Sequence, residues 1–264
     1  MSDVKLTQDG HVLTITIDRP SKKNAFTLEV IDGIVDALRK AQRDPECRAV
    51  ILTGSGDAFC AGVDLSEVAD MQEAGADGAY HWKAFLMERI HTIALTLDAF
   101  DKPVIAAVNG PAYGAGMDLA LMCDMRFLSH SARLCEAYVN LGVVPGDGGC
   151  YYLPRLVGPA KALELLMSGR VVEPDEARSL GLANDVVADD KLMEHSMAFA
   201  RVLTAKSPIA LRMIKRATYQ SMNCDLRTSL DLISSHMSVV QTLADTAEAN
   251  AAFTGRRRAQ FKEE

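Results

Sequence analysis

Two glycine-rich segments, each set between a short β-branched run and a helical pattern, constrain the fold of this chain most strongly. The first is 58–65, Ala-Phe-Cys-Ala-Gly-Val-Asp-Leu, and the second is 109–119, Asn-Gly-Pro-Ala-Tyr-Gly-Ala-Gly-Met-Asp-Leu. Small residues let another group approach the main chain closely, and the backbone N–H groups of such turns point into open space. Two such turns, brought together, supply the paired donors that stabilise an oxyanion or an enolate.

Strand and helix patterns alternate around these turns. Residues 11–18 alternate apolar and polar side chains as a half-buried strand does, whereas 49–54 and 103–108 are apolar runs typical of buried strands. Helical spacing covers 28–43, with Thr27 at the N-cap position, and 82–100. A shorter helix over 119–125 and a strand over 125–128 follow. The alternation predicts βαβ units and an α/β fold.

From Pro159 onward the pattern is mainly helical, and the predicted helices cover 163–168, 188–205, 208–219 and 226–253. The sequence Lys-Ser-Pro at 206–208 punctuates this region. We therefore predict an α/β core domain over residues 1–200, followed by a helical C-terminal region over 201–264. At 264 residues the chain is long enough for such an arrangement.

Composition excludes several classes of protein. The apolar share of 48% is ample for a core, and the formal net charge of −7 argues against a nucleic-acid surface. The sequence contains no apolar run of 18 residues, and its start lacks the pattern of a signal peptide, so we expect neither a membrane nor a secretory protein. Six scattered cysteines indicate free thiols in the cytoplasm. The histidine spacing indicates no metal site, and without G-x-G-x-x-G we expect no nicotinamide or flavin.

An ordered series of motifs covers nearly the whole chain. It comprises Arg19-Pro20 with Asn24-Ala25, then segments 59–65, 102–110, 114–119, 145–149, 153–155 and 177–182. This series resembles the crotonase superfamily, also called the enoyl-CoA hydratase/isomerase family. The resemblance implies a ββα spiral core, assembly as a homotrimer or a dimer of trimers, and binding of acyl-CoA thioesters whose enolate is stabilised.

The same resemblance implies site residues. The oxyanion donors fall on the backbone N–H groups of Val63 and Ala115, Asp64 bonds the oxyanion loop, and Tyr113 packs beside the pocket. Arg19, Lys22 and Lys23 are candidates for the CoA phosphates, although lysines at a strand end are commonly only solvated. The implied acyl-CoA contacts are Lys23, Ala25, Ala61, Gly62, Val63, Asp64, Leu65, Tyr113, Gly114, Ala115 and Gly142.

The acid/base residues depart from the family's hydratases. Those enzymes are similar in carrying glutamates where this chain has Asp118 and Tyr138, and a tyrosine with a reference pKa of ~10 is no carboxylate base near pH 7. Asp118 resembles the aspartate of the dienoyl-CoA isomerase branch, which also has carboxylates at the positions of Tyr138 and Gly146. An alternative interpretation gives Asp118 only the role of stabilising a helix N-terminus.

Asp147 follows a proline-glycine pair. Ring-isomerising members of the family resemble this chain but place an aspartate one residue earlier, where Gly146 stands. Glycines on both sides of Asp147 let the backbone adjust, so that its carboxylate reaches the site. The alternative is an ordinary Asp-Gly turn. Asp118 and Asp147 would then form a carboxylate pair, with Tyr138 as a hydrogen-bond donor or wall.

These observations predict a cytoplasmic acyl-CoA enzyme that hydrates or shifts the double bond of an enoyl thioester. CoA enters as part of the substrate, and no further cofactor is implied. Two alternatives remain open at this point. One is a ring-isomerising or hydrolytic enzyme on the same enolate platform, and the other is a noncatalytic CoA-binding subunit, which the missing glutamate pair suggests.

Overall fold

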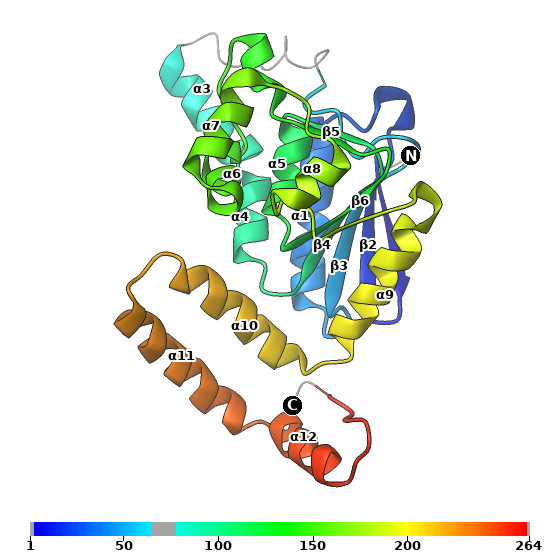
Figure 1. Ribbon diagram of the computed structural model, residues 1–264, viewed down its shortest axis with the longest axis vertical. Coiled ribbons are helices and arrows are strands. Elements are labelled where there is room, and N and C mark those ends of the chain that lie inside the picture. Colours follow the sequence, from blue (N-terminus) through cyan, green and yellow to red (C-terminus); the bar gives the residue numbers. More distant parts are fainter. Residues whose placement is uncertain (1–2, 65–77, 263–264) are drawn as a thin grey trace.

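The core is built on a mainly parallel sheet. The computed structural model describes residues 3–64 and 78–262 (Figure 1). Six strands lie in the order β1-β2-β3-β4-β6-β8, with β1 antiparallel to β2 and every other neighbouring pair parallel. Their bounds are Val4–Asp9 (β1), Val12–Ile17 (β2), Ala49–Gly54 (β3), Val104–Val108 (β4), Met125–Ser129 (β6) and Asp185–Val187 (β8).

The central strands are buried on both faces, which explains their continuous apolar sequence. In β3, Val50 and Leu52 belong to the large hydrophobic cluster that includes the buried face of α1 (Leu28–Arg43). Ile51, between them, belongs to a second cluster with residues of α9 (Leu192–Thr204) on the opposite face. The predicted cap of α1 is confirmed, since the Thr27 side chain accepts a hydrogen bond from the Val30 N–H.

A second row of short strands runs beside the main sheet. Strands β5 (Pro111–Tyr113) and β7 (Arg133–Cys135) are parallel neighbours. Single pairings extend this row on both sides, Cys60 with Ala112 and Leu134 with Val172. Each repeat of the chain thus contributes one long strand and one short pairing, and helices follow them. The predicted ββα spiral core is confirmed.

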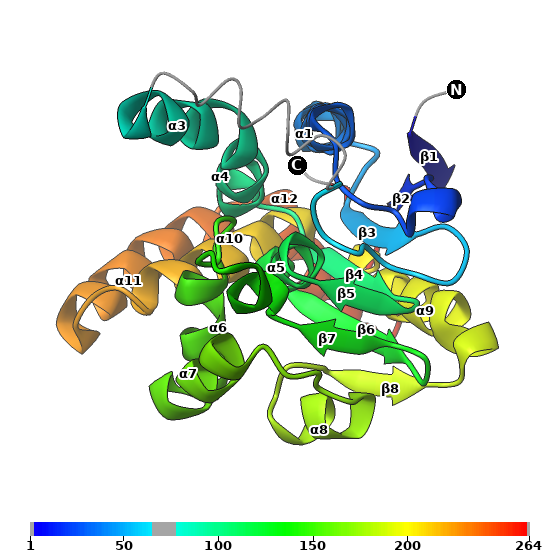
Figure 2. The same cartoon turned by 90° about the horizontal axis from the view of Figure 1, so that it is seen from above.

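Helices cover the core on both sides of the sheet (Figure 2). The remaining α-helices of the core are α3 (Ala79–Phe85), α4 (Thr92–Ala99), α5 (Ala115–Met122), α6 (Gly149–Val157), α7 (Pro159–Ser168) and α8 (Pro174–Ser179). Three 3₁₀ turns, η1 (Pro20–Lys22), η3 (Ala137–Leu141) and η4 (Asp189–Lys191), complete it. Within the described ranges, no helix is long and apolar enough to cross a bilayer.

Three C-terminal helices extend away from this core (Figure 1). They are α10 (Pro208–Ser221), α11 (Leu226–Gln241) and α12 (Ala244–Thr254). The Lys215 ammonium of α10 ties this region to the core by an ion pair of 2.8 Å with Asp124. The division into 1–200 and 201–264 stays a prediction, and α9, which spans it, packs on the sheet.

The structure corrects three predicted helices. The segment 82–100 is interrupted by a π-helical turn, η2 (Leu86–Ile90), where the His91 N–H donates to the Leu86 carbonyl, five residues back. The segment 226–253 is two helices, because the chain turns between α11 and α12. Helix α5 begins at Ala115, four residues before the predicted start, since Gly114 has a φ of 51° and turns the chain directly into the helix.

Candidate active site

The two glycine-rich segments lie against each other. The Cys60 carbonyl accepts a hydrogen bond of 3.0 Å from the Tyr113 N–H, and the Cys60 N–H donates to the Pro111 carbonyl at 3.1 Å. Glycine is required at this contact. A Cβ at Gly116 would lie 2.0 Å from the Cys60 oxygen, and one at Gly62 would lie 2.8 Å from the Tyr113 oxygen.

Both predicted oxyanion donors stand at this junction, and their N–H groups have no acceptor among residues 3–64 and 78–262. Val63 pairs with Phe26, but that pairing uses the Gly62 carbonyl and the Asp64 N–H rather than the Val63 amide. Ala115 is the first residue of α5, where an N–H has no partner within the helix. Neither amide donates a hydrogen bond to any group in the described part of the chain. The positive end of the helix dipole adds to the attraction for an anion there.

An ion pair supports the first loop from behind. The Arg19 guanidinium lies 2.9 Å from Asp64 and 3.0 Å from Asp3, and it donates to the Ala25 carbonyl at 2.6 Å. Asp64 is buried, so its charge has its partner in Arg19. This geometry occupies Arg19 and leaves Lys22 and Lys23 as the exposed cations of the stretch.

The other implied CoA contacts are distributed around the first loop. The Ala61 N–H donates to the Lys23 carbonyl at 3.0 Å, so these two residues are neighbours, and the Lys23 ammonium binds Asp57 at 2.6 Å. Ala25 is buried. Leu65 lies outside the described residues. Gly142 ends η3 with a φ of 71°, and a Cβ at this position would meet no described atom within 4 Å.

Three predicted acid/base residues form one chain of contacts. The Tyr138 Oη lies 2.6 Å from Asp118 Oδ2 and 2.6 Å from Asp147 Oδ2. Asp118 comes from the first turn of α5, Tyr138 from η3, and Asp147 from the loop before α6. A Cβ at Gly114 would lie 3.7 Å from the Tyr138 ring, so the ring also adjoins the residue before the Ala115 donor. Asp147 therefore reaches Tyr138, and the structure brings the three side chains together.

Proton counting constrains this cluster. A phenol carries one O–H donor, and ionised carboxylates only accept. Two short contacts at one tyrosine oxygen are both hydrogen bonds only when one of the two carboxyls carries a proton and donates to the phenol. Two hydrogen bonds at Tyr138 therefore require one proton on the carboxyl pair, with one of Asp118 and Asp147 protonated and the other ionised.

Burial raises the pKa of all three side chains in this cluster. Asp118 is fully buried, and burial together with the Asp147 charge raises its pKa to about 7, although the Tyr138 hydrogen bond opposes the rise. Burial likewise raises the pKa of Asp147. Burial and the two carboxylates raise the pKa of Tyr138 well above its ordinary value, so the phenol stays protonated near pH 7.

The sequence reasoning missed a third carboxyl in this cluster, Glu136. It follows β7 and is 1% exposed. Asp118 Oδ1 and both Glu136 carboxyl oxygens are buried without a hydrogen-bond partner in the described residues. The one available signal was an acidic side chain at the end of the apolar run Leu134-Cys135, where a buried strand ends.

His91 is a second residue that the sequence reasoning missed. Its Nε2 lies 2.8 Å from the Gly146 carbonyl, and it acts on the Asp147 carboxyl by lowering its pKa, against the larger effect of burial. The π-helical turn at 86–90 shifts the helical register just before His91. A prediction based on regular α-helical spacing therefore could not indicate where the His91 side chain points.

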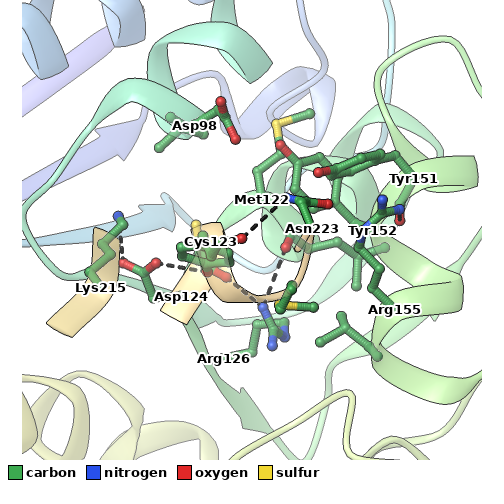
Figure 3. A pocket seen from close by; sticks show the side chains of 15 residues that line it. Asp98, Met122, Cys123, Asp124, Arg126, Tyr151, Tyr152, Arg155, Lys215 and Asn223 are labelled. Carbon is green, nitrogen blue, oxygen red and sulfur yellow. Dashed lines mark hydrogen bonds and ion pairs between the residues drawn. The ribbon is translucent and has the colours of Figure 1, made fainter. Parts of the chain in front are cut away.

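A cavity of about 130 Å³ lies on another side of α5, between the core and α10 (Figure 3). Its lining includes Arg126, Tyr152 and Lys215, and none of the predicted site residues. Arg126 is buried there with its Nη1 2.6 Å from the Cys123 carbonyl, so that the guanidinium satisfies the carbonyls at the C-terminal end of α5. The cavity is therefore separate from the acid cluster.

Comparisons with known proteins agree with this geometry. The model of the enoyl-CoA hydratase/isomerase family matches residues 7–264. A short-chain-enoyl-CoA hydratase of Clostridium acetobutylicum is 34% identical over 261 residues, which cover 98% of this chain and 97% of that protein. A 1,2-epoxyphenylacetyl-CoA isomerase of Escherichia coli is 34% identical over 251 residues, which cover 95% and 94%.

Solved structures show the same architecture. The crystal structure of an enoyl-CoA hydratase from Bacillus anthracis superposes with a TM-score of 0.93 at 32% sequence identity, covering 99% of this chain and 100% of that one. The match by sequence spans the spiral core and the C-terminal helices alike. This chain belongs to the enoyl-CoA hydratase/isomerase family, the crotonase superfamily.

Proposed function

We propose that this enzyme shifts the double bond of an enoyl-CoA thioester by proton transfer. Membership in the family makes it an acyl-CoA enzyme of the hydratase/isomerase type. In the proposed reaction the Val63 and Ala115 N–H groups bind the thioester oxygen. Asp118, Tyr138 and Asp147 move the proton. CoA is part of the substrate.

The observation that carries the proposal is the Tyr138 hydroxyl between two carboxyls, 2.6 Å from each. Hydration calls for a water held between a general acid and a general base. Here the phenol oxygen occupies the position between Asp118 and Asp147. A pair that shares one proton is instead suited to removing a proton from one carbon and returning one to another.

The proposed step conserves the atoms of the substrate. An ionised carboxylate of the pair accepts a proton from the γ-carbon, the C–H electrons enter the conjugated system, and the charge develops on the thioester oxygen. The two backbone donors stabilise that oxygen in the dienolate. The protonated partner then delivers its proton to the α-carbon, and Tyr138 passes a proton between Asp118 and Asp147 to restore the starting state.

The pKa of about 7 for Asp118 matches this exchange. A general base works best when its pKa lies near the operating pH, because it then accepts and returns a proton with similar ease. Tyr138 is partly exposed, whereas Asp118 is fully buried. The Tyr138 hydroxyl is therefore the accessible group of the cluster, and a proton passes through it between the substrate and the buried Asp118 carboxyl.

An assay of product mass tests the proposal. We expect 3-enoyl-CoA and 2-enoyl-CoA substrates of short, medium and aromatic acyl groups to yield products of unchanged mass with a shifted double bond. In heavy water, the product would gain solvent deuterium at carbon. A product heavier by one water would assign hydration instead, and free CoA would assign hydrolysis. Acyl-CoA binding without any turnover would favour the noncatalytic subunit.

Self-association through the C-terminal helices belongs to the same proposal. Leu226, Leu230, Ile233 and Met237 are exposed and recur every three or four residues, so that they share one face of α11. An apolar stripe of this kind supports the homotrimer or dimer of trimers expected from the family. Sedimentation equilibrium is expected to give three or six times the chain mass of 28.6 kDa. A monomer at micromolar concentration would contradict it.

We propose a cytoplasmic location because the cysteines are free thiols. All six cysteines are free, and four of them, Cys47, Cys60, Cys123 and Cys135, are buried. Free thiols of this kind are usual in a reducing compartment.

A further inference from the structure

Glu136 is a buried acid that the proposed reaction does not use. It stands between β7 and η3, two residues before Tyr138. At 1% exposure, neither of its carboxyl oxygens has a hydrogen-bond partner in the described parts of the chain. A carboxylate in that position would be an uncompensated buried charge, which folded proteins rarely tolerate.

The Glu136 and Asp118 carboxyls converge on Gly149. A Cβ at Gly149 would lie 2.5 Å from Asp118 Oδ1, and 2.8 and 2.9 Å from the two Glu136 oxygens. The glycine thus leaves the space in which the two carboxyls meet. Oδ1 is the Asp118 oxygen that Tyr138 does not use, since the phenol binds Oδ2. One proton on Glu136 would join one of its oxygens to Asp118 Oδ1 by a hydrogen bond.

Among the described residues, the groups that act directly on Glu136 and Asp118 carry no positive charge. Tyr138 and Asp147 face it from η3 and the following loop, Cys135 adjoins it from β7, and Cys150 and Tyr152 act on it from α6. His91 acts on Asp147 from the start of α4. Among the described residues, no lysine or arginine contacts either carboxyl. A proton is therefore the available means of relieving the repulsion between Glu136 and Asp118.

We propose that Glu136 is a positioning residue that remains a carboxylic acid, donates a hydrogen bond to Asp118 Oδ1, and thereby holds the Asp118 carboxylate ionised and directed at Tyr138. The inference rests on the proposed role of Asp118 as the base. It makes Glu136 the end of a four-membered chain, Glu136–Asp118–Tyr138–Asp147, in which each link between neighbours is one proton.

The ionisation of the cluster is consistent with this arrangement. Burial, followed by the Asp118 charge, raises the pKa of Glu136 to about 10, so the side chain is neutral over the working range. Asp118, with a pKa of about 7, ionises first and becomes the acceptor. Removal of the donor would destabilise that carboxylate and raise its pKa.

Infrared difference spectroscopy tests the protonation of Glu136 without reference to activity. At pH 8.5, above the pKa of Asp118 and below that of Glu136, the wild type is expected to show the C=O band of a buried carboxylic acid. Protonated Asp147 contributes a second band of this kind, so the Glu136 band is identified as the one that Glu136→Gln removes and that Asp147→Asn and Asp118→Asn keep. If Glu136→Gln removed no carboxylic acid band, the inference would be overturned, even if the enzyme proved to be an isomerase.

The pH profile of kcat tests the positioning role with two variants of similar size. Glu136→Gln keeps a neutral N–H donor, so its midpoint should stay within ~0.3 pH units of the wild-type value. Glu136→Leu has no donor, so its midpoint should rise by ~1–2 pH units. The reason is that a hydrogen bond to a charged group stabilises the carboxylate by ~1.5–3 kcal/mol, which corresponds to a pKa change of that size. Its rate should fall ~10–100-fold at pH 6 and recover as the pH rises. Glu194→Gln, at an exposed site, is the matched control.

Two results would overturn the positioning role. If Glu136 were ionised, Glu136→Gln would remove a negative charge and lower the midpoint. If Glu136 only filled space, both variants would lose activity equally without a shift. Circular dichroism excludes unfolding, and if the leucine variant does not fold, the glutamine profile and the infrared band decide. If the Asp118→Asn enzyme were active and still showed the Glu136 band, Asp118 would not be the base, whereas the protonation of Glu136 would stand.

Discussion

Asp118→Asn is expected to lower kcat by ~10²–10⁴, the usual contribution of a general acid or base, while acyl-CoA binding is retained. Asparagine has the same shape but cannot accept a proton and return it, so the exchange with Asp147 through Tyr138 stops. The oxyanion donors are backbone groups and remain in place. Stopped-flow or mass-spectrometric turnover, together with calorimetric titration of an acyl-CoA, measures the two effects separately.

The same substitution should stabilise the fold near neutral pH. Because burial raises the pKa of Asp118 to about 7, the folded state binds a proton more tightly than the unfolded state does. Stability is therefore full below the unfolded pKa of ~3.9 and falls as the pH rises towards the folded value. Asparagine removes this loss. The difference in the free energy of unfolding, variant minus wild type, should therefore be larger at pH 8 than at pH 4 by on the order of 1–4 kcal/mol. Urea unfolding at both pH values checks the sign.

A matched control separates loss of chemistry from loss of structure. Asp190→Asn changes an exposed aspartate of η4, far along the chain from the acid cluster, and should leave both kcat and stability near the wild-type values. Full turnover in Asp118→Asn would remove this residue from the mechanism and transfer the role of base to Asp147. An enzyme that was inactive and also less stable at pH 8 would contradict the buried, proton-sharing state.

Gly116→Ala is expected to affect both stability and catalysis. The new Cβ would lie 2.0 Å from the Cys60 oxygen and 2.8 Å from the Cys60 carbonyl carbon, far inside van der Waals contact with backbone that cannot rotate away. The two loops must separate, which moves the Ala115 N–H relative to the Val63 N–H. We expect ~1–3 kcal/mol of destabilisation from overpacking and a fall of ~10²–10³ in kcat from the displaced donor.

Gly33→Ala supplies the comparison for this change. Gly33 lies inside α1, where alanine favours the helix by about 1 kcal/mol, and its new Cβ would meet only the Val4 side chain, at 3.0 Å. Denaturant unfolding and steady-state kinetics should show a small net change there. If Gly116→Ala lost stability but kept kcat, the contact of Gly116 with Cys60 would have no part in holding the proposed donors.

Much of the architecture could be predicted from local sequence. The apolar run 49–54 is β3, and the helical spacing that starts after Thr27 is α1, with the expected cap. These predictions succeeded because a strand buried on both faces and an amphipathic helix each leave a periodic pattern. The family resemblance added the spiral order of the repeats and directed attention to Val63, Ala115 and Asp118.

Contacts between distant segments were harder to predict. The predicted helix 82–100 is interrupted before His91 because the chain forms a π-helical turn there. Helix α5 starts earlier than predicted because Gly114 has a positive φ. Asp147 presented two equal interpretations in the sequence, because its neighbouring glycines permit several backbone paths. Its contact with Tyr138 follows from the path that the loop takes in the folded chain.

The sequence by itself determined the α/β class, the family, the small residues that let the two loops approach, and the absence of the usual glutamate pair at Asp118 and Tyr138. These are properties of residue type and order along the chain. Only the tertiary structure decided that Glu136 faces Asp118 across Gly149, and that Tyr138 bridges two carboxyls. A carboxyl's protonation depends on its burial and on the charges around it, which come from segments far apart in the sequence.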